Sequence, residues 1–94
     1  MTEYRITEFT SSDMDKALEA AESLRSIIET AGAEFIDILN CGDGKGMVVA
    51  KYSDPATMET SSAVAKQAFG KLIEAGVVDG ASISARTGSV MISF

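Results

Sequence analysis

Apolar residues concentrate in two short runs near the middle of the chain, Phe35 to Leu39 and Met47 to Tyr52. Both runs are rich in Val, Ile and Phe, and a turn with Gly42, Gly44 and Gly46 separates them, so the pattern predicts the two strands of a hairpin. In each run the apolar residues occupy odd and even positions alike. Because successive side chains of a strand point to opposite faces, both faces of this sheet are predicted to favour burial.

Two longer stretches carry apolar residues at helical spacing. The first predicted helix runs from Asp13 to about Ala31, with Ser11 or Ser12 as its N-cap and Gly32 after its last turn. Its apolar stripe consists of Met14, Ala17, Leu18, Ala21, Leu24, Ile28 and Ala31.

The second predicted helix runs from about Pro55 to Ala75, with Asp54 as its N-cap and Gly76 at its end. Its inner face consists of Met58, Ser62, Ala65, Phe69, Leu72 and Ile73. Gly70 is a poor helix former in the middle of this segment, and we attribute it to close packing of the helix against the sheet.

The two ends of the chain predict flanking strands. In residues 3–9, apolar and polar side chains alternate until Phe9, which is apolar at a position where the alternation requires a polar residue. We therefore expect a first strand with an irregularity near Thr7 or Glu8. In the tail we expect a strand, a turn at Thr87-Gly88-Ser89 and a further strand. A single bent strand is the competing interpretation.

The predicted elements follow the order β-α-β-β-α-β, with one possible extra C-terminal strand. This order predicts a single α+β domain over residues 1–94 with the ferredoxin-like, split βαβ arrangement. Right-handed crossovers place both helices on one face of an antiparallel sheet. The other face stays open although it is apolar, which is typical of an interaction surface. We therefore expect a homodimer through the open sheet face, because one patch then serves both copies.

Composition excludes several classes of partner. The chain carries 14 acidic and 8 basic side chains, a net charge of −6, which argues against nucleic acid and membrane surfaces. Cys41 is the only cysteine and histidine is absent, so we expect no internal disulfide, no metal site and no cofactor. The N-terminus does not resemble a signal peptide, and no apolar run approaches the length of a membrane span. We therefore expect a cytoplasmic protein.

In element order, length and doubly apolar strands, the chain resembles the dimeric α/β-barrel superfamily. This group includes small cofactor-free monooxygenases of the antibiotic-biosynthesis type, muconolactone isomerases and stress-responsive barrel proteins. The resemblance implies a dimer whose two sheets form a barrel, and a pocket for a small organic molecule. These monooxygenases often carry histidine and tryptophan near the pocket, and this chain has neither.

The glycine-rich turn offers few groups for chemistry. It lacks the spacing of a phosphate-binding loop and joins two strands, so a hairpin turn is the favoured interpretation. Asn40 beside it could orient a substrate carbonyl or shape the turn. Without a histidine to activate it, Cys41 is predicted to be a packed, unreactive thiol.

Polar-tipped residues on the predicted strands are the remaining candidates: Tyr4, Arg5, Asp37, Tyr52 and Arg86. The pattern leaves open which face of the sheet each one occupies. We take Tyr4, Asn40, Tyr52 and Arg86 as ligand-binding candidates. Asn40, Tyr52 and Arg86 are also the catalytic candidates, which would hold an enolate oxygen in a metal-free oxygenase.

Two functions remain open from the sequence. The first is a homodimer that binds or transforms a small organic molecule without metal, in the manner of a monooxygenase or an isomerase. The second is a non-catalytic dimerisation or regulatory module with a filled core. The absence of histidine as a base favours the second function.

Overall fold

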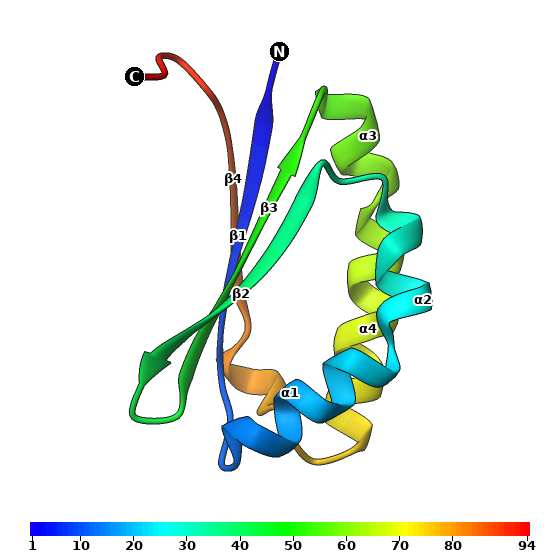
Figure 1. The fold of residues 1–94 in the computed structure, drawn as a ribbon, viewed down its shortest axis with the longest axis vertical. Helices are drawn as coiled ribbons and strands as arrows, with labels where there is room; N and C mark the ends of the chain where they lie inside the picture. Colours follow the sequence, from blue (N-terminus) through cyan, green and yellow to red (C-terminus); the bar gives the residue numbers. More distant parts are fainter.

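The computed structural model describes residues 1–94 and consists of one sheet and one layer of helices (Figure 1). The strands are β1 (Glu3–Thr10), β2 (Phe35–Gly42), β3 (Lys45–Tyr52) and β4 (Ser84–Ser89). The helices lie on one face of the sheet and leave the other face uncovered. The predicted β-α-β-β-α-β order and the placement of the helices on one face are confirmed.

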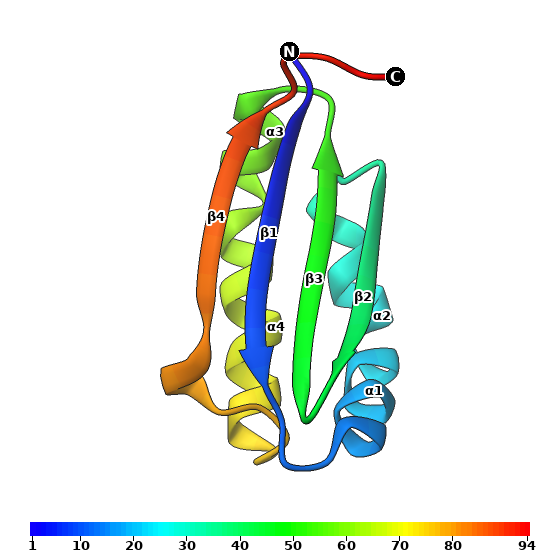
Figure 2. The same cartoon turned by 90° about the vertical axis from the view of Figure 1, so that its left-hand side faces the viewer.

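The sheet is antiparallel throughout, with the strand order β2-β3-β1-β4 (Figure 2). The register of β1 against β3 continues unbroken from Glu3 to Thr10, so the predicted irregularity near Thr7 or Glu8 is wrong. The parity changes at Phe9 because both faces of the sheet are apolar, not because the strand bulges. The register shift of the sheet lies instead in β2, between Asn40 and Gly42.

Each predicted helix is present and is broken once. The first consists of α1 (Met14–Ser23) and α2 (Arg25–Ile28), followed by the 3-10 turn η1 (Glu29–Ala31). Its N-cap is Asp13, whose carboxylate accepts a hydrogen bond from the Lys16 N–H. The predicted caps Ser11 and Ser12 are therefore wrong. The Ser11 N–H donates instead to the carbonyl of Gly44, which ties this loop to the hairpin turn.

The second helix consists of α3 (Pro55–Thr60) and α4 (Ser62–Glu74), with Ser61 at the break. Asp54 accepts from the Thr57 N–H at 2.7 Å, which confirms the predicted N-cap. The predicted reason for Gly70 is wrong, because a methyl group built there meets no atom within 4 Å.

The C-terminal region forms one strand rather than two. After the 3-10 turn η2 (Gly80–Ser82), β4 pairs with β1 through Thr87, Gly88 and Ser89. The predicted turn at these residues is wrong because the edge of β1 offers backbone partners along this whole length. Residues 91–94 continue without regular structure, so no extra strand is present.

The strands present apolar side chains to both faces. Phe9, Ala50 and Tyr52 face the helices and are buried. On the open face, Ile6 and Phe35 remain 39% and 38% exposed. The prediction that the sheet is apolar on both faces is confirmed. Within one chain the helices bury only one of these faces, and the sheet does not close into a barrel.

Candidate functional site

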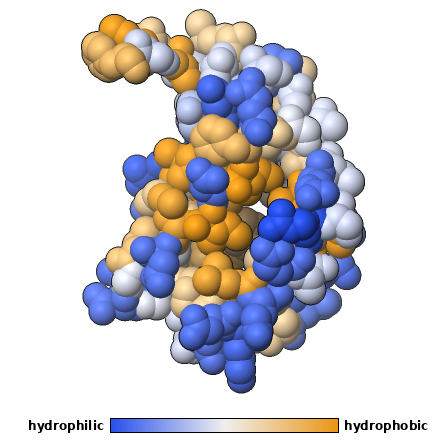
Figure 3. Space-filling model, viewed as in Figure 1, coloured by the Kyte–Doolittle hydropathy of each residue, from blue (hydrophilic) through white to orange (hydrophobic).

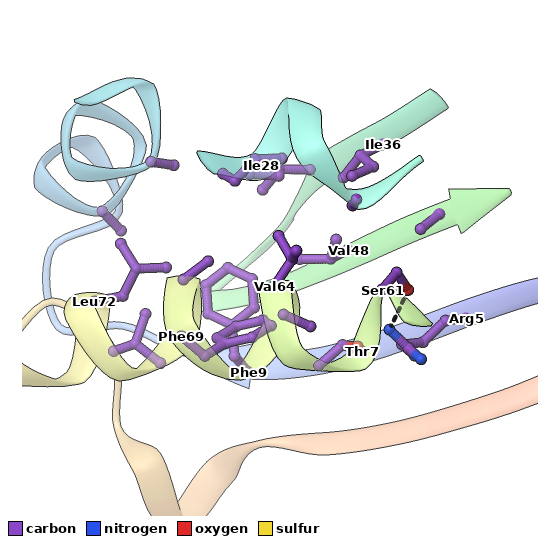
Figure 4. A pocket seen from close by; sticks show the side chains of 18 of the residues that line it. Arg5, Thr7, Phe9, Ile28, Ile36, Val48, Ser61, Val64, Phe69 and Leu72 are labelled. Atoms are coloured by element: carbon purple, nitrogen blue, oxygen red, sulfur yellow. Dashed lines mark hydrogen bonds between the residues drawn. The ribbon is translucent and has the colours of Figure 1, made fainter. Parts of the chain in front are cut away.

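An apolar cavity of about 90 Å³ lies between the sheet and the helices. Of its 20 lining residues, 17 are hydrophobic and six are alanines. Figure 4 shows Phe9, Phe69 and Leu72 toward one end of this cavity and Arg5 with Ser61 at the other. Short side chains between a sheet and a helix layer leave unfilled space, and an apolar cavity of this kind can accept an apolar ligand.

The cavity opens toward the β2 edge of the sheet. Five residues line both the cavity and an outer groove of about 570 Å³: Leu18, Ala21, Ile28, Ile36 and Ile38. Figure 3 shows apolar side chains around a hollow on this side of the molecule. Because β2 is an edge strand, no further strand covers the entrance. The groove therefore gives a small molecule a path to the cavity.

Charged side chains line the rim of the groove, and Glu22 and Arg25 are paired there. Arg25 donates to the two carboxylate oxygens of Glu22 at 2.6 and 2.9 Å. The hydrogen bond and the charge of Arg25 lower the pKa of Glu22, and the same contact raises the pKa of Arg25. Glu29 and Glu34 also line the groove, so its rim is net acidic.

Arg5 supplies the one charged side chain that lines the cavity. Its Nη1 donates to Ser61 Oγ at 3.1 Å, and its Nη2 donates to the Met58 carbonyl at 2.9 Å and to Ser62 Oγ at 2.7 Å. The guanidinium carbon lies 5.7 Å from the centre of the Tyr52 ring, within the range of a cation–π contact. The break between α3 and α4 thus brings two hydroxyls and a carbonyl to Arg5.

Tyr52 is the predicted site residue that lies in the cavity, and it is 2% exposed. Asn40 is exposed in β2, where its side-chain oxygen accepts from the Gly42 N–H at 3.0 Å and so shapes the turn. Tyr4 stands edge-to-face with Phe35, with ring centres 6.2 Å apart, and shares the parity of Ile6 on the open face.

Arg86 is exposed in β4 and lies opposite Ile6 in the register, so it too belongs to the open face. The structure therefore does not bring the four predicted residues together. Arg5, which lines the cavity, was among the polar-tipped strand residues but was not taken as a ligand-binding or catalytic candidate. Residues 5 and 9 lie an even number of positions apart in β1, so Arg5 points to the same face as the buried Phe9. This spacing is the signal that could have placed Arg5 on the buried face.

Cys41 is exposed, so the prediction of a packed thiol is wrong. It lies next to the register shift of β2, near the tip of the hairpin. No group of three or more His, Cys, Asp or Glu side chains comes together in a way that could hold a metal ion. None of the helices combines the length and the apolar character required to cross a membrane.

No protein-family model matches the chain, and no curated protein matches its sequence. Its structure is similar to that of SnoaB, a cofactor-independent oxygenase from Streptomyces nogalater, with a TM-score of 0.76 at 9% identity over 98% of this chain and 95% of SnoaB. A dimeric ferredoxin-like protein of unknown function from Jannaschia sp. CCS1 gives a TM-score of 0.71 at 14% identity, over 96% of this chain and 100% of that protein. Another dimeric ferredoxin-like protein, from an uncultured marine organism, gives a TM-score of 0.68 at 12% identity, over 99% of this chain and 90% of that protein.

The chain has a ferredoxin-like fold. This confirms the fold predicted from the order of the elements. At identities this low the likeness concerns the fold, and a shared fold hosts many different functions. The function therefore depends on the residues that line the cavity.

Proposed function

We propose that this protein binds a small, largely apolar organic molecule in the cavity between its sheet and its helices. The observation that carries this proposal is an apolar cavity, with 17 hydrophobic residues among 20, that continues into an open groove at the β2 edge. Binding sites for small molecules are typically concave and apolar, with a few placed polar groups. Arg5, Thr7 and Ser61 are the polar lining residues here.

Benzyl alcohol, a neutral one-ring compound, serves as the probe in an NMR titration of the 15N-labelled protein. Ala65 lines the cavity, whereas Ala63 lies exposed in the same helix. We expect the probe to shift signals of cavity residues in the wild type and in the matched control Ala63→Phe. The Ala65→Phe variant fills the cavity and is expected to lose the response. A wild type whose cavity signals do not move would overturn the proposal and favour a non-catalytic module.

We further propose that the bound molecule is transformed without metal, as an oxygenase would do with an activated quinol or anthrone. In such a reaction the substrate loses a proton, and its carbanion reduces dioxygen. One oxygen atom becomes the carbonyl oxygen of the product, and the other leaves as water with the abstracted proton and the second hydrogen of the same carbon. SnoaB is described as a cofactor-independent oxygenase, and this likeness of fold supports the extension. Tyr52 is the predicted catalytic candidate that lines the cavity, and we propose that its hydroxyl holds the enolate oxygen.

Oxygen uptake with anthrone measures this activity directly. We expect uptake above the rate of anthrone alone, and we expect Ala65→Phe to abolish the difference while Ala63→Phe retains it. Uptake that matches the uncatalysed rate with anthrone and with a panel of activated quinols would exclude the oxygenase while leaving the binding proposal to its own titration.

We also propose that two copies associate through the open sheet face. Its apolar side chains are Tyr4, Ile6, Phe35, Leu39, Met47 and Val49. Exposed apolar side chains gathered on one face commonly mark a partner surface, and a two-fold dimer covers them with a second copy of the same face. Two solved proteins of similar fold are described as dimeric, which supports this arrangement.

Analytical ultracentrifugation at micromolar concentration tests the dimer. Ile6 on the open face and Ile73 on α4 are 39% and 40% exposed, so Ile6→Lys and Ile73→Lys form a matched pair. We expect the wild type and Ile73→Lys to sediment as dimers and Ile6→Lys to sediment as a monomer. A wild type that is monomeric and stable at these concentrations would contradict the proposal.

A further inference from the structure

We propose that Arg5 selects ligands with an anionic oxygen, so that the molecule bound in the cavity is a small organic anion, a carboxylate or an enolate, with an apolar body. This inference rests on the proposed binding function and specifies the head group of the ligand. Arg5 lies at one end of the cavity beside Ser61, and the remaining wall is almost entirely apolar (Figure 4). The chemistry of the cavity is therefore that of a cation at the end of an apolar chamber.

Arg5 has no ion-pair partner within the chain. The ion pairs of the structure involve Arg25 and Lys51, and none involves Arg5. The buried carboxylate nearest in sequence is that of Glu3, which accepts from Ser89 Oγ at 2.6 Å and forms no ion pair with Arg5. A half-buried cation next to apolar walls is costly unless an anion approaches it. An anionic ligand would supply the missing partner.

The hydrogen bonds of Arg5 hold it in place without neutralising it. Its three bonds go to two hydroxyl oxygens and one backbone carbonyl, all of them uncharged. A guanidinium has five N–H donors, so the Nε–H and one Nη1–H have no partner within the chain. Because the side chain is already ordered, binding an anion there costs little additional conformational entropy.

The acidic rim of the groove does not cancel this preference. Glu22 and Arg25 are exposed, and exposed charges are largely screened at physiological ionic strength. The net charge of −6 is expected to slow the approach of an anion. The contact with Arg5, by contrast, is a charge-assisted hydrogen bond, which is stronger than a neutral one.

Benzoate and benzyl alcohol test the inference because they share a ring and differ in the head group. We expect the wild type to bind benzoate about tenfold more tightly than benzyl alcohol. The Arg5→Gln variant is expected to lose this preference and still bind the alcohol. Lys71→Gln removes one positive charge from an exposed position of α4 that lines neither the cavity nor the groove, so it serves as the matched control and is expected to retain the preference.

The Nε–H signal of Arg5 gives a second measurement that needs no variant. The chain contains three arginines, Arg5, Arg25 and Arg86, so their Nε–H signals can be assigned. We expect benzoate, and not benzyl alcohol, to shift the Arg5 signal in the wild type.

Equal binding of the two compounds, or an equal loss of preference in Lys71→Gln, would overturn the role of Arg5 and leave the proposed function intact. If neither benzoate nor benzyl alcohol bound, the proposed function would be overturned as well. The two failures are thereby distinguished.

Discussion

The contact between Phe9 and Gly46 gives a specific prediction for the stability of the fold around the cavity. The two residues lie opposite each other in the β1–β3 register. A methyl group built on Gly46 would lie 2.2 Å from Phe9 Cζ, and 2.6 and 2.8 Å from its two Cε atoms. The ring would have to move by about 1 Å, since ordinary contact begins at 3.4 Å. Phe9 is 6% exposed and stands edge-to-face with Phe69 at 6.2 Å, so it has little room to do so.

The substitution Gly46→Ala is therefore expected to destabilise the fold. Overpacking in an enclosed core costs about 1–3 kcal/mol, and the enclosure of the Phe9 ring places this case near 2 kcal/mol. A loss of about 2 kcal/mol lowers the Tm of a domain of this size by roughly 8–16 °C. The displaced ring would also enter the cavity, so we expect weaker binding of benzyl alcohol.

Thermal unfolding followed by circular dichroism, together with urea titration, measures this loss. Gly70→Ala is the matched control, because a methyl group there meets no atom within 4 Å. As an alanine inside a helix it is expected to stabilise the protein by about 0.5–1 kcal/mol. The reasoning would be refuted if Gly46→Ala were as stable as the wild type, or if both substitutions destabilised the protein equally.

Three further predictions concern the helix ends and the groove rim. The hydrogen bond from the Thr57 N–H lowers the pKa of Asp54. The cap therefore stabilises the fold above about pH 4, and this stabilisation is lost as the pH falls through the lower pKa of the folded state. Asp54→Asn should retain the cap and show a flatter acid dependence of Tm, whereas Asp54→Ala should lower the Tm at neutral pH. Gly32 has a φ of 74°, so Gly32→Ala should cost about 1–2 kcal/mol in urea titration. Arg25 and Glu22 are both exposed, so Arg25→Gln should leave the Tm unchanged.

Local patterns in the sequence determined the elements and the apolar character of the sheet. The runs around Phe35 and Met47 predicted a hairpin with two apolar faces, and Asp54 and Gly32 predicted helix ends that the structure confirms. These features depend on neighbours within a few residues, on side-chain alternation and on capping geometry. They are therefore readable without knowledge of the tertiary structure.

The tertiary structure alone decided which polar residues meet. Tyr52 and Arg5 share a face with Ser61 only because β3 pairs with β1 in one register and because the second helix breaks at Ser61. The register of β1 against β4 places Arg86 on the opposite face. Strand pairing and helix breaks depend on contacts between residues far apart in the chain, and a shift of one residue moves every side chain of a strand to the other face. The cavity and its charged end thus follow from packing, whereas the elements around them follow from local pattern.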